Sequence, residues 1–142
     1  MTLKRDYGFT FIETIVSLSI ILILTAAVGF SSVKYIDKAR VVSCRNQIET
    51  LRLALQSYYT DCGQYPSEAQ GLIALWEKPV LAPIPLKWDG PYTDRRIPKD
   101  PWGNDYIYKK PGEKNLPFTI ISYGADSMTG GEGSNADINS WD

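Results

Sequence analysis

Apolar residues dominate the first quarter of this 142-residue chain and then become periodic. Residues 14–33 carry no charged side chain. At roughly 1.5 Å of rise per residue, such a run crosses a hydrocarbon core of roughly 30 Å as an α-helix. Serine, threonine and glycine dilute the run, so it predicts a modest membrane span rather than a strongly apolar one.

A cleaved secretory signal is the alternative interpretation of this run, because Lys4 and Arg5 precede it. However, the run is longer than a typical signal core, and residues 26–29 offer no clear cleavage site. Basic residues also follow the run, at positions 34, 38 and 40. Charge counting therefore leaves open which side of a membrane holds the rest of the chain.

The apolar positions after the run recur at steps of three and four, which is typical of one face of an α-helix. They are Val41, Cys44, Ile48, Leu51, Leu55 and Tyr58. No proline occurs before Pro66 to break the helix. We predict one long helix from about Phe9 to about Tyr59, able to flex at Gly29, whose second half covers a soluble core. The sequence Asp61-Cys62-Gly63 supplies the stop.

The long helix also decides how the two cysteines, Cys44 and Cys62, are interpreted. Along a helix they lie roughly 25 Å apart, far beyond the separation that a disulfide tolerates. A periplasmic disulfide would require the helix to end early. We therefore predict that Cys44 is a core residue and that Cys62 is a free thiol in a loop.

The chain changes character after Gly63, where the helical period is lost. Ser67 and Gln70 have the spacing of a capping box, in which each side chain satisfies a backbone amide of the other residue. This spacing predicts a short helix that continues through Trp76 and is ended by Pro79.

The remaining residues predict a loop, a hairpin and a tail. The proline-rich segment 79–101 is expected to form an ordered, aromatic-lined loop. Residues 106–108 and 118–123 have strand composition and flank a turn, which predicts a β-hairpin. The tail, residues 124–142, is rich in glycine and aspartate and lacks apolar periodicity. These elements predict an α+β fold in which the long helix packs on a small antiparallel sheet.

Composition narrows the function classes. A formal net charge of −1 and a pI near 5.5 give no electrostatic reason to expect a nucleic-acid partner. Histidine is absent, which removes the commonest general base and the commonest metal ligand. No nucleophile with an adjacent base is visible. We therefore expect no enzyme activity, and a membrane-anchored enzyme or solute-binding module has no site to support it.

Glu13 is the most informative residue, because it stands alone in an apolar stretch and no further charge occurs before Lys34. A carboxylate placed in a bilayer costs a few kcal/mol and usually faces a protein partner. A glutamate that reaches the lipid headgroups is the simpler alternative, but it does not explain the neighbouring residues.

These features together resemble a known family. The basic leader, Gly8, Phe9 and Glu13, followed by an apolar span and an amphipathic helix, is similar to the N-terminus of type IV pilins and pseudopilins. Further motifs resemble the major, G-type pseudopilins of type II secretion, namely Tyr65-Pro66, Gln70-Gly71-Leu72, Leu75, Lys78-Pro79, residues 98–104 and residues 124–138. The resemblance covers nearly the whole chain and implies a type IV pilin-like fold.

The resemblance also implies a domain organisation. Residues 1–8 would be a leader that a membrane peptidase removes by cutting after Gly8, and the same enzyme would methylate the new amine of Phe9. Residues 9–33 would form the transmembrane and assembly half of the helix, and residues 34–142 the periplasmic globular domain. The carboxylate of Glu13 would pair with the N-terminal amine of a neighbouring subunit.

A calcium site in the tail is a further implication of the resemblance. Asp126 and Asp137 match the acidic positions of the family, Tyr123 and Ser127 would offer backbone carbonyls, and Asn135 is a weaker side-chain candidate. Hard oxygen ligands on a glycine-rich loop suit Ca²⁺. The spacing is not that of an EF-hand. Without the resemblance, the tail would be interpreted as a solvated acidic loop.

The implied function is that of a structural subunit of the type II secretion pseudopilus. Such a subunit polymerises through its N-terminal helix and drives the export of folded periplasmic proteins across the outer membrane. Its partners would be copies of itself, minor pseudopilins, the prepilin peptidase and methyltransferase, and the inner-membrane assembly platform. It would be a single-pass protein of the bacterial inner membrane with its globular domain in the periplasm. The alternative is a type IV pilin or a minor pseudopilin of a related filament system.

Overall fold

The computed structural model describes residue 8 and residues 10–142, and the side chains of residues 27–34 lie outside that description. Phe9 and residues 1–7 of the predicted leader are also outside it. The chain divides into two compact units, residues 1–37 and 38–142, and we call the second the folded unit.

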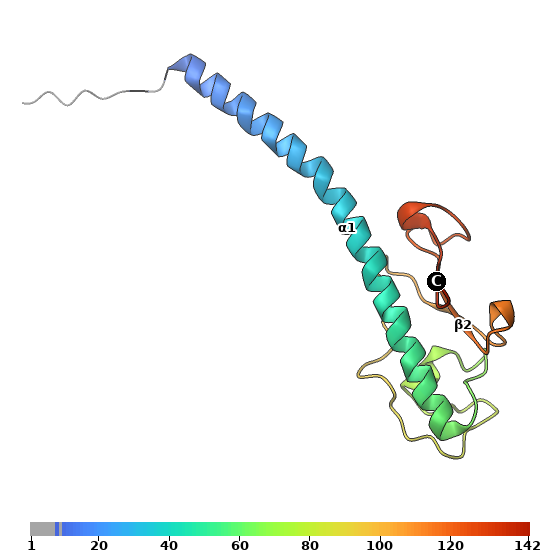
Figure 1. Ribbon diagram of the computed structural model, residues 1–142. Helices are drawn as coiled ribbons and strands as arrows, with labels where there is room; N and C mark the ends of the chain where they lie inside the picture. The colour runs from blue at the N-terminus through green and yellow to red at the C-terminus, as the bar shows by residue number, and fades with distance from the viewer. Residues whose placement is uncertain (1–7, 9) are drawn as a thin grey trace, which may run out of the picture. The chain divides into compact units, whose positions relative to one another are not determined.

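A single helix, α1 (Phe11–Cys62), accounts for 52 residues and contributes to both units (Figure 1). It confirms the predicted long helix and ends three residues later than expected. Gly63 stops it by adopting a φ of 72°, and its N–H donates to the carbonyl oxygen of Tyr59 at 2.8 Å. The prediction for Cys62 was wrong in part, because this residue is the last of the helix and does not lie in a loop.

No helix in the described part of the chain is both long enough and apolar enough to cross a membrane. The predicted span, residues 14–33, includes residues 27–33, whose side chains lie outside the description. The expected flexing point, Gly29, falls in the same range, where the backbone is helical.

The core of the second unit lies under the predicted apolar stripe of α1. Cys44, Ile48, Leu51, Leu55 and Tyr58 are all buried, which confirms the stripe, and Val41 packs at its edge. They meet side chains of the sheet and of the segments that lead into it, including Tyr106, Tyr108, Phe118, Ile120 and Ile138. The helical period therefore decides which face of α1 closes the domain.

The sheet has three antiparallel strands in the order β1 (Ile107–Lys109), β2 (Thr119–Ser122) and β3 (Ile138–Asn139). Tyr108 pairs with Ile120, and Ser122 pairs with Ile138. The first two strands confirm the predicted hairpin, whose turn contains a short 3₁₀ helix, η2 (Glu113–Asn115). The third strand was not predicted; it belongs to the tail and forms one edge of the sheet.

The capping box forms, but the element after it is shorter than predicted. Ser67 N–H donates to Oε1 of Gln70 at 2.8 Å, and Gln70 N–H donates to Oγ of Ser67 at 3.2 Å. Gly71 then adopts a φ of 61° and interrupts the helix. A 3₁₀ helix, η1 (Leu72–Leu75), follows in place of the predicted helix through Trp76.

The predicted aromatic-lined loop is confirmed. The indole of Trp88 donates to the carbonyl oxygen of Ala74 at 3.0 Å and makes an edge contact with the ring of Tyr92, with centroids 5.8 Å apart. Both rings pack on the core. The loop therefore gains its order from aromatic packing and side-chain hydrogen bonds rather than from regular secondary structure.

Candidate functional site

The start of α1 is a capping box formed by Thr10 and Glu13. The Thr10 N–H and hydroxyl donate to Oε2 of Glu13 at 3.0 and 2.9 Å, and Glu13 N–H donates to Oγ1 of Thr10 at 3.3 Å. Thr10 is thus the N-cap residue and Glu13 the third residue of the helix. The Thr-x-x-Glu spacing was a readable signal that the sequence analysis missed.

The two carboxylate oxygens of Glu13 have different environments. Oε2 accepts both bonds from Thr10, whereas Oε1 accepts none from the described residues. The side chain is exposed. One half of this anion is therefore used to begin the helix, and the other half is open to a group from outside the described chain.

The helix surface beyond Glu13 is apolar on all sides. Large apolar side chains of residues 11–24 are exposed around its circumference, among them Phe11 and Leu22. Three hydroxyls in this part of α1 bond to its own backbone: Thr14, Ser19 and Thr25 donate to carbonyl oxygens at 2.7–2.8 Å. A surface with this composition is suited to apolar surroundings, because these three hydroxyls need no partner from outside the helix.

The second candidate site is the tail loop, residues 125–133. Ala125 N–H donates to the carbonyl oxygen of Ser134 at 2.9 Å, which closes the loop at its base next to the 3₁₀ helix η3 (Gly133–Asn135). Gly131 has a φ of 89°, and a Cβ there would lie 2.6 Å from the carbonyl oxygen of Asn135. Glycine is therefore required at this position, both for the conformation and for the close approach.

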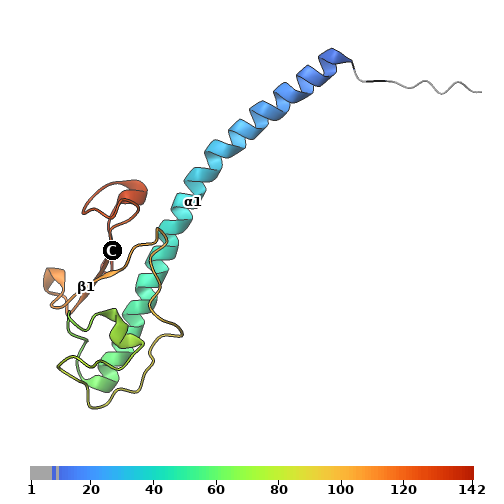
Figure 2. The ribbon, with the colours of Figure 1, turned by 180° about the vertical axis from the view of Figure 1, so that it is seen from behind.

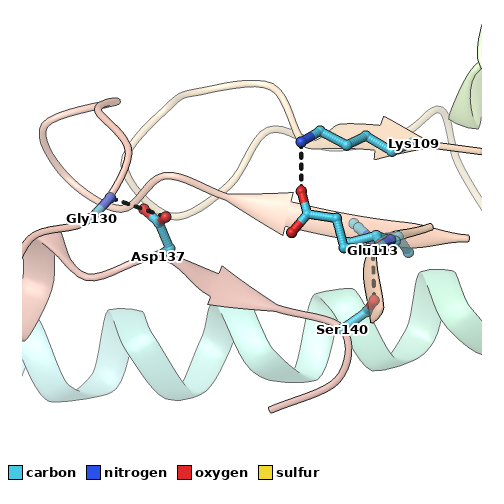
Figure 3. Close-up of polar contacts among 7 residues, drawn as sticks. Lys109, Glu113, Gly130, Asp137 and Ser140 are labelled. Atoms are coloured by element: carbon cyan, nitrogen blue, oxygen red, sulfur yellow. Dashed lines mark hydrogen bonds and ion pairs between the residues drawn. The ribbon is translucent and has the colours of Figure 1, made fainter. Parts of the chain in front are cut away.

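Asp137 is the predicted ligand whose surroundings best fit a cation. Its Oδ2 accepts the N–H of Gly130 at 3.0 Å, and the side chain points into the loop (Figure 3). Its Oδ1 is buried and has no hydrogen-bond partner among the described residues. Buried carboxylate oxygens are normally paired, so this oxygen has the chemistry of a metal ligand.

The other predicted ligands lie in or beside the same loop. Oδ1 of Asp126 accepts the N–H of Met128 at 3.0 Å, and Ser127 has a φ of 58°. Within residues 10–142, no hydrogen bond joins two of the five predicted ligands, which also include Tyr123, Asn135 and Asp137. No group of three or more acidic, cysteine or histidine side chains that could hold a metal occurs in the described chain. A cation here would therefore depend on backbone and amide oxygens besides the aspartates.

A buried turn supports the base of the tail loop. Asp100 is buried, and its carboxylate accepts the N–H groups of Trp102 and Asn104 at 3.0 and 2.8 Å and the hydroxyl of Ser122 at 2.7 Å. The side-chain amide of Asn104 donates in turn to the carbonyl oxygen of Gly124 at 3.1 Å. The sequence analysis did not predict this role, although an aspartate ahead of Trp-Gly-Asn is a typical turn signal.

The cysteines do not form a reactive site. Both are free thiols, as predicted. Cys44 is fully buried beside the hydroxyl of Tyr106, and burial raises the pKa of its thiol, which disfavours the reactive thiolate. Cys62 is half-buried and donates to the carbonyl oxygen of Lys87 at 3.2 Å.

Comparison with known proteins identifies the family. Residues 31–141 match the model of "Type II secretion system (T2SS), protein G", and residues 3–29 match the prokaryotic N-terminal methylation motif. The chain belongs to the type II secretion system protein G family. The predicted resemblance is thereby confirmed, and the three-stranded pilin-like fold with its long helix is that of this family.

Individual relatives agree with the family assignment. The type II secretion system core protein G of Pseudomonas aeruginosa is 40% identical over 142 residues, covering 100% of this chain and 99% of the relative. That of Vibrio cholerae is 39% identical over 140 residues, covering 98% of this chain and 94% of the relative. The crystal structure of the major pseudopilin of enterohaemorrhagic Escherichia coli aligns with a TM-score of 0.64 at 37% identity, over 74% of this chain and 89% of that one.

Membership of the protein G family, together with the methylation motif, implies a membrane-anchored periplasmic protein that assembles with itself and with other secretion components. The family match spans the folded unit, whereas the motif covers the start of α1 where Glu13 lies. The two candidate sites therefore fall in separately matched parts of the chain.

Proposed function

We propose that this chain is a structural subunit, not an enzyme, of the type II secretion pseudopilus. It polymerises through the N-terminal half of α1 and drives the export of folded periplasmic proteins across the outer membrane. The observation that supports this most is the half-used carboxylate of Glu13 at the start of an apolar helix surface. The names of the relatives and of the structural neighbour favour the major pseudopilin over a type IV pilin or a minor pseudopilin.

Removal of the leader exposes the N-terminus through which the subunit assembles. The prepilin peptidase and methyltransferase cuts after Gly8 and methylates the amine of Phe9, and a single span of residues 9–33 holds the subunit in the inner membrane with its globular domain in the periplasm. The capping box survives this cut, because both of its residues, Thr10 and Glu13, lie after Gly8. The assembly platform and minor pseudopilins then receive the mature subunit.

The open oxygen of Glu13 sets the register of assembly. An unpaired carboxylate in lipid is unfavourable, and removing one partner of a buried ion pair costs several kcal/mol. The ammonium of Phe9 on a neighbouring subunit offsets this cost only when it reaches Oε1. A subunit docked one turn out of place leaves both charges unpaired, so the penalty selects one arrangement.

We further propose that the tail loop binds Ca²⁺ through Asp126 and Asp137, with backbone carbonyls of Tyr123 and Ser127 and the amide of Asn135. The orphan Oδ1 of Asp137 and the glycine-rich backbone support this assignment. When bound, the ion would neutralise the two carboxylates and fix the conformation of a loop whose residues 125–133 are all exposed.

The experiment that tests the function begins with the mature N-terminus. Full-length protein is isolated from membranes of a strain with an intact secretion system, and its N-terminal peptide is analysed by mass spectrometry. We expect N-methylated phenylalanine at position 9, and filaments of this chain in electron micrographs. An intact start, a cut near Gly29, or correctly processed protein that never forms filaments would overturn the proposal.

A further inference from the structure

One loop of the folded unit exposes its large apolar side chains to solvent. We call residues 79–86 the apolar loop, because they contain no charged residue. Leu86 is 98% exposed and Val80 is 85% exposed, and Leu81 and Ile84 are also exposed. A contiguous exposed set of this kind marks an interaction surface more often than single exposed residues do.

The apolar loop is held in place although its side chains point outward. Gln70 is buried, and its side-chain amide donates to the carbonyl oxygens of Leu81 and Pro83 at 2.7 and 2.9 Å. Its Oε1 accepts the N–H of Ser67, so both polar atoms of this side chain hold the apolar loop and the turn before it. A loop fixed in this way loses little conformational freedom when a partner binds.

A shallow cavity adjoins the apolar loop. Its volume is about 180 Å³, and it is lined by residues 69–70, 73–74 and 77–81, including the apolar side chains of Ile73, Val80 and Leu81. The cavity is open to solvent. Its size and lining suit one apolar side chain supplied by a neighbouring molecule.

Charge identifies a matching surface on the same chain. Exposed lysines, Lys78 and Lys87, immediately flank the apolar loop; Asp89 and Glu77, which pairs with Arg96, lie one or two positions further out. After Lys114 the chain has four acidic residues, Asp126, Glu132, Asp137 and Asp142, and no lysine or arginine. A divalent cation on Asp126 and Asp137 would still leave this segment negative. Within the tail loop, residues 125–133, Met128 is the exposed large apolar side chain.

The two surfaces are placed for contact between molecules rather than within one. In Figures 1 and 2, the tail loop and the segment around residue 80 lie at opposite ends of the folded unit in both views. A surface at one end that complements a different surface at the other end produces a heterologous contact, which continues from copy to copy.

We propose that the apolar loop binds the tail loop of a second copy of this chain, with Met128 of that copy in the cavity and its Glu132 beside Lys87. Methionine is suited to this position because its unbranched side chain adapts to irregular cavities. The contact rests on the proposed function, since it joins the folded units of neighbouring subunits in the filament and supplements the pairing at Glu13.

Cross-linking in assembled filaments tests the contact. The full chain carrying both Leu86→Cys and Met128→Cys is treated with a short bismaleimide, and the two single variants and the unaltered chain serve as controls for the native thiols. We expect a ladder of multimers from the double variant alone. Normal filaments without a ladder would overturn the proposal, and so would dimers from Leu86→Cys alone, which would show that the loop meets its own counterpart.

Charge reversal provides an independent measurement. Lys87→Glu and Glu132→Lys should each lower the amount of filament by about threefold, and combining them should restore it, because the exchanged charges again attract each other across the contact. Both sites are exposed, so thermal unfolding of each variant should match the unaltered chain. Additive losses in the double variant would overturn the contact. If the unaltered chain forms no filament, the proposed function fails first, and this contact fails with it.

Discussion

Asn104 donates its side-chain amide to the carbonyl oxygen of Gly124 at 3.1 Å, and this bond links the buried turn at Asp100 to the base of the tail loop. Gly124 leaves no room for a side chain, because its φ is 61° and a Cβ there would lie 2.7 Å from the carbonyl oxygen of Ser134. The turn motif thus acts on a loop twenty residues away.

Replacing Asn104 by alanine should loosen the tail loop. We expect the free energy of unfolding to fall by about 1 kcal/mol, the usual net contribution of one hydrogen bond, and the tail to become more sensitive to proteases. Denaturant unfolding and limited proteolysis measure the two effects. Asn46→Ala, at an exposed position of α1, is the control; it should neither lower the free energy of unfolding nor raise protease sensitivity, because alanine favours a helix. Equal behaviour of the two variants would exclude a supporting role for Asn104.

Two substitutions at Glu13 separate helix capping from assembly. Glutamine can keep the capping box with Thr10, since an amide oxygen still accepts the two bonds, but it cannot pair with an ammonium. We therefore expect Glu13→Gln and Glu13→Ala to insert into the membrane and to lose filaments alike, by about tenfold. Immunoblots of sheared filaments provide the measurement. Normal assembly of the glutamine variant would show that the residue acts only as a cap.

Calcium removal should destabilise the folded unit. We expect a chelator to lower the Tm of the unaltered protein, and added Ca²⁺ to restore it, because an ion bound only by the folded state stabilises it by mass action. The Asp126→Ala and Asp137→Asn variants should melt at the chelated value with and without Ca²⁺. Magnesium is the control cation, since it prefers fewer and closer ligands. An unaltered protein with the same Tm in Ca²⁺ and in chelator would exclude the site.

The glycines of the tail loop differ in what a side chain would meet. Gly131→Ala places a Cβ 2.6 Å from a carbonyl oxygen, whereas Gly133→Ala meets nothing within 4 Å, and both positions have positive φ. We expect a loss of roughly 3 kcal/mol for the first and about 1 kcal/mol for the second. Chemical denaturation of both variants tests the difference. Equal losses would mean that the loop relaxes away from the contact.

Buried tyrosines predict a stability that falls in alkali. Burial raises the pKa of Tyr58 to about 12, and it also raises the pKa values of Tyr106 and Tyr108. A tyrosine ionises near pH 10 in the unfolded chain, so above that pH the unfolded state binds fewer protons and stability declines until the folded pKa is passed. Tyr58→Phe should reduce the slope between pH 10 and 12 by about 1.4 kcal/mol per pH unit. An unchanged slope would contradict the assignment.

The long helix was predictable from sequence, because its apolar pattern extends over many residues. The stripe from Val41 to Tyr58 and the lack of proline before Pro66 predict α1 and its buried face, because one physical pattern repeats over several turns. The third strand, β3, was not predictable, because it has only two residues and only Ile138 is buried. Its strand character comes from pairing with β2, which no local pattern reports.

The candidate sites divide in the same way. The single charge of Glu13 in an apolar stretch predicted a functional residue. The capping box with Thr10 was missed, although the Thr-x-x-Glu spacing predicts it. The helix predicted after Ser67 was too long. The capping box starts a turn, but Gly71 has a φ of 61° and ends it, and this effect of Gly71 was not predicted. The orphan oxygen of Asp137 depends on the folded path of the tail, so composition could suggest a metal ligand but not which oxygen is unpaired.

The unbroken helix between the two thiols has a consequence for how the protein matures. Since Cys44 and Cys62 are held apart on one rigid rod, an oxidant can form no internal bridge without unwinding it. The folded unit therefore contains no internal disulfide whose formation or reduction could change its fold, and it needs no thiol oxidase or disulfide isomerase to close one.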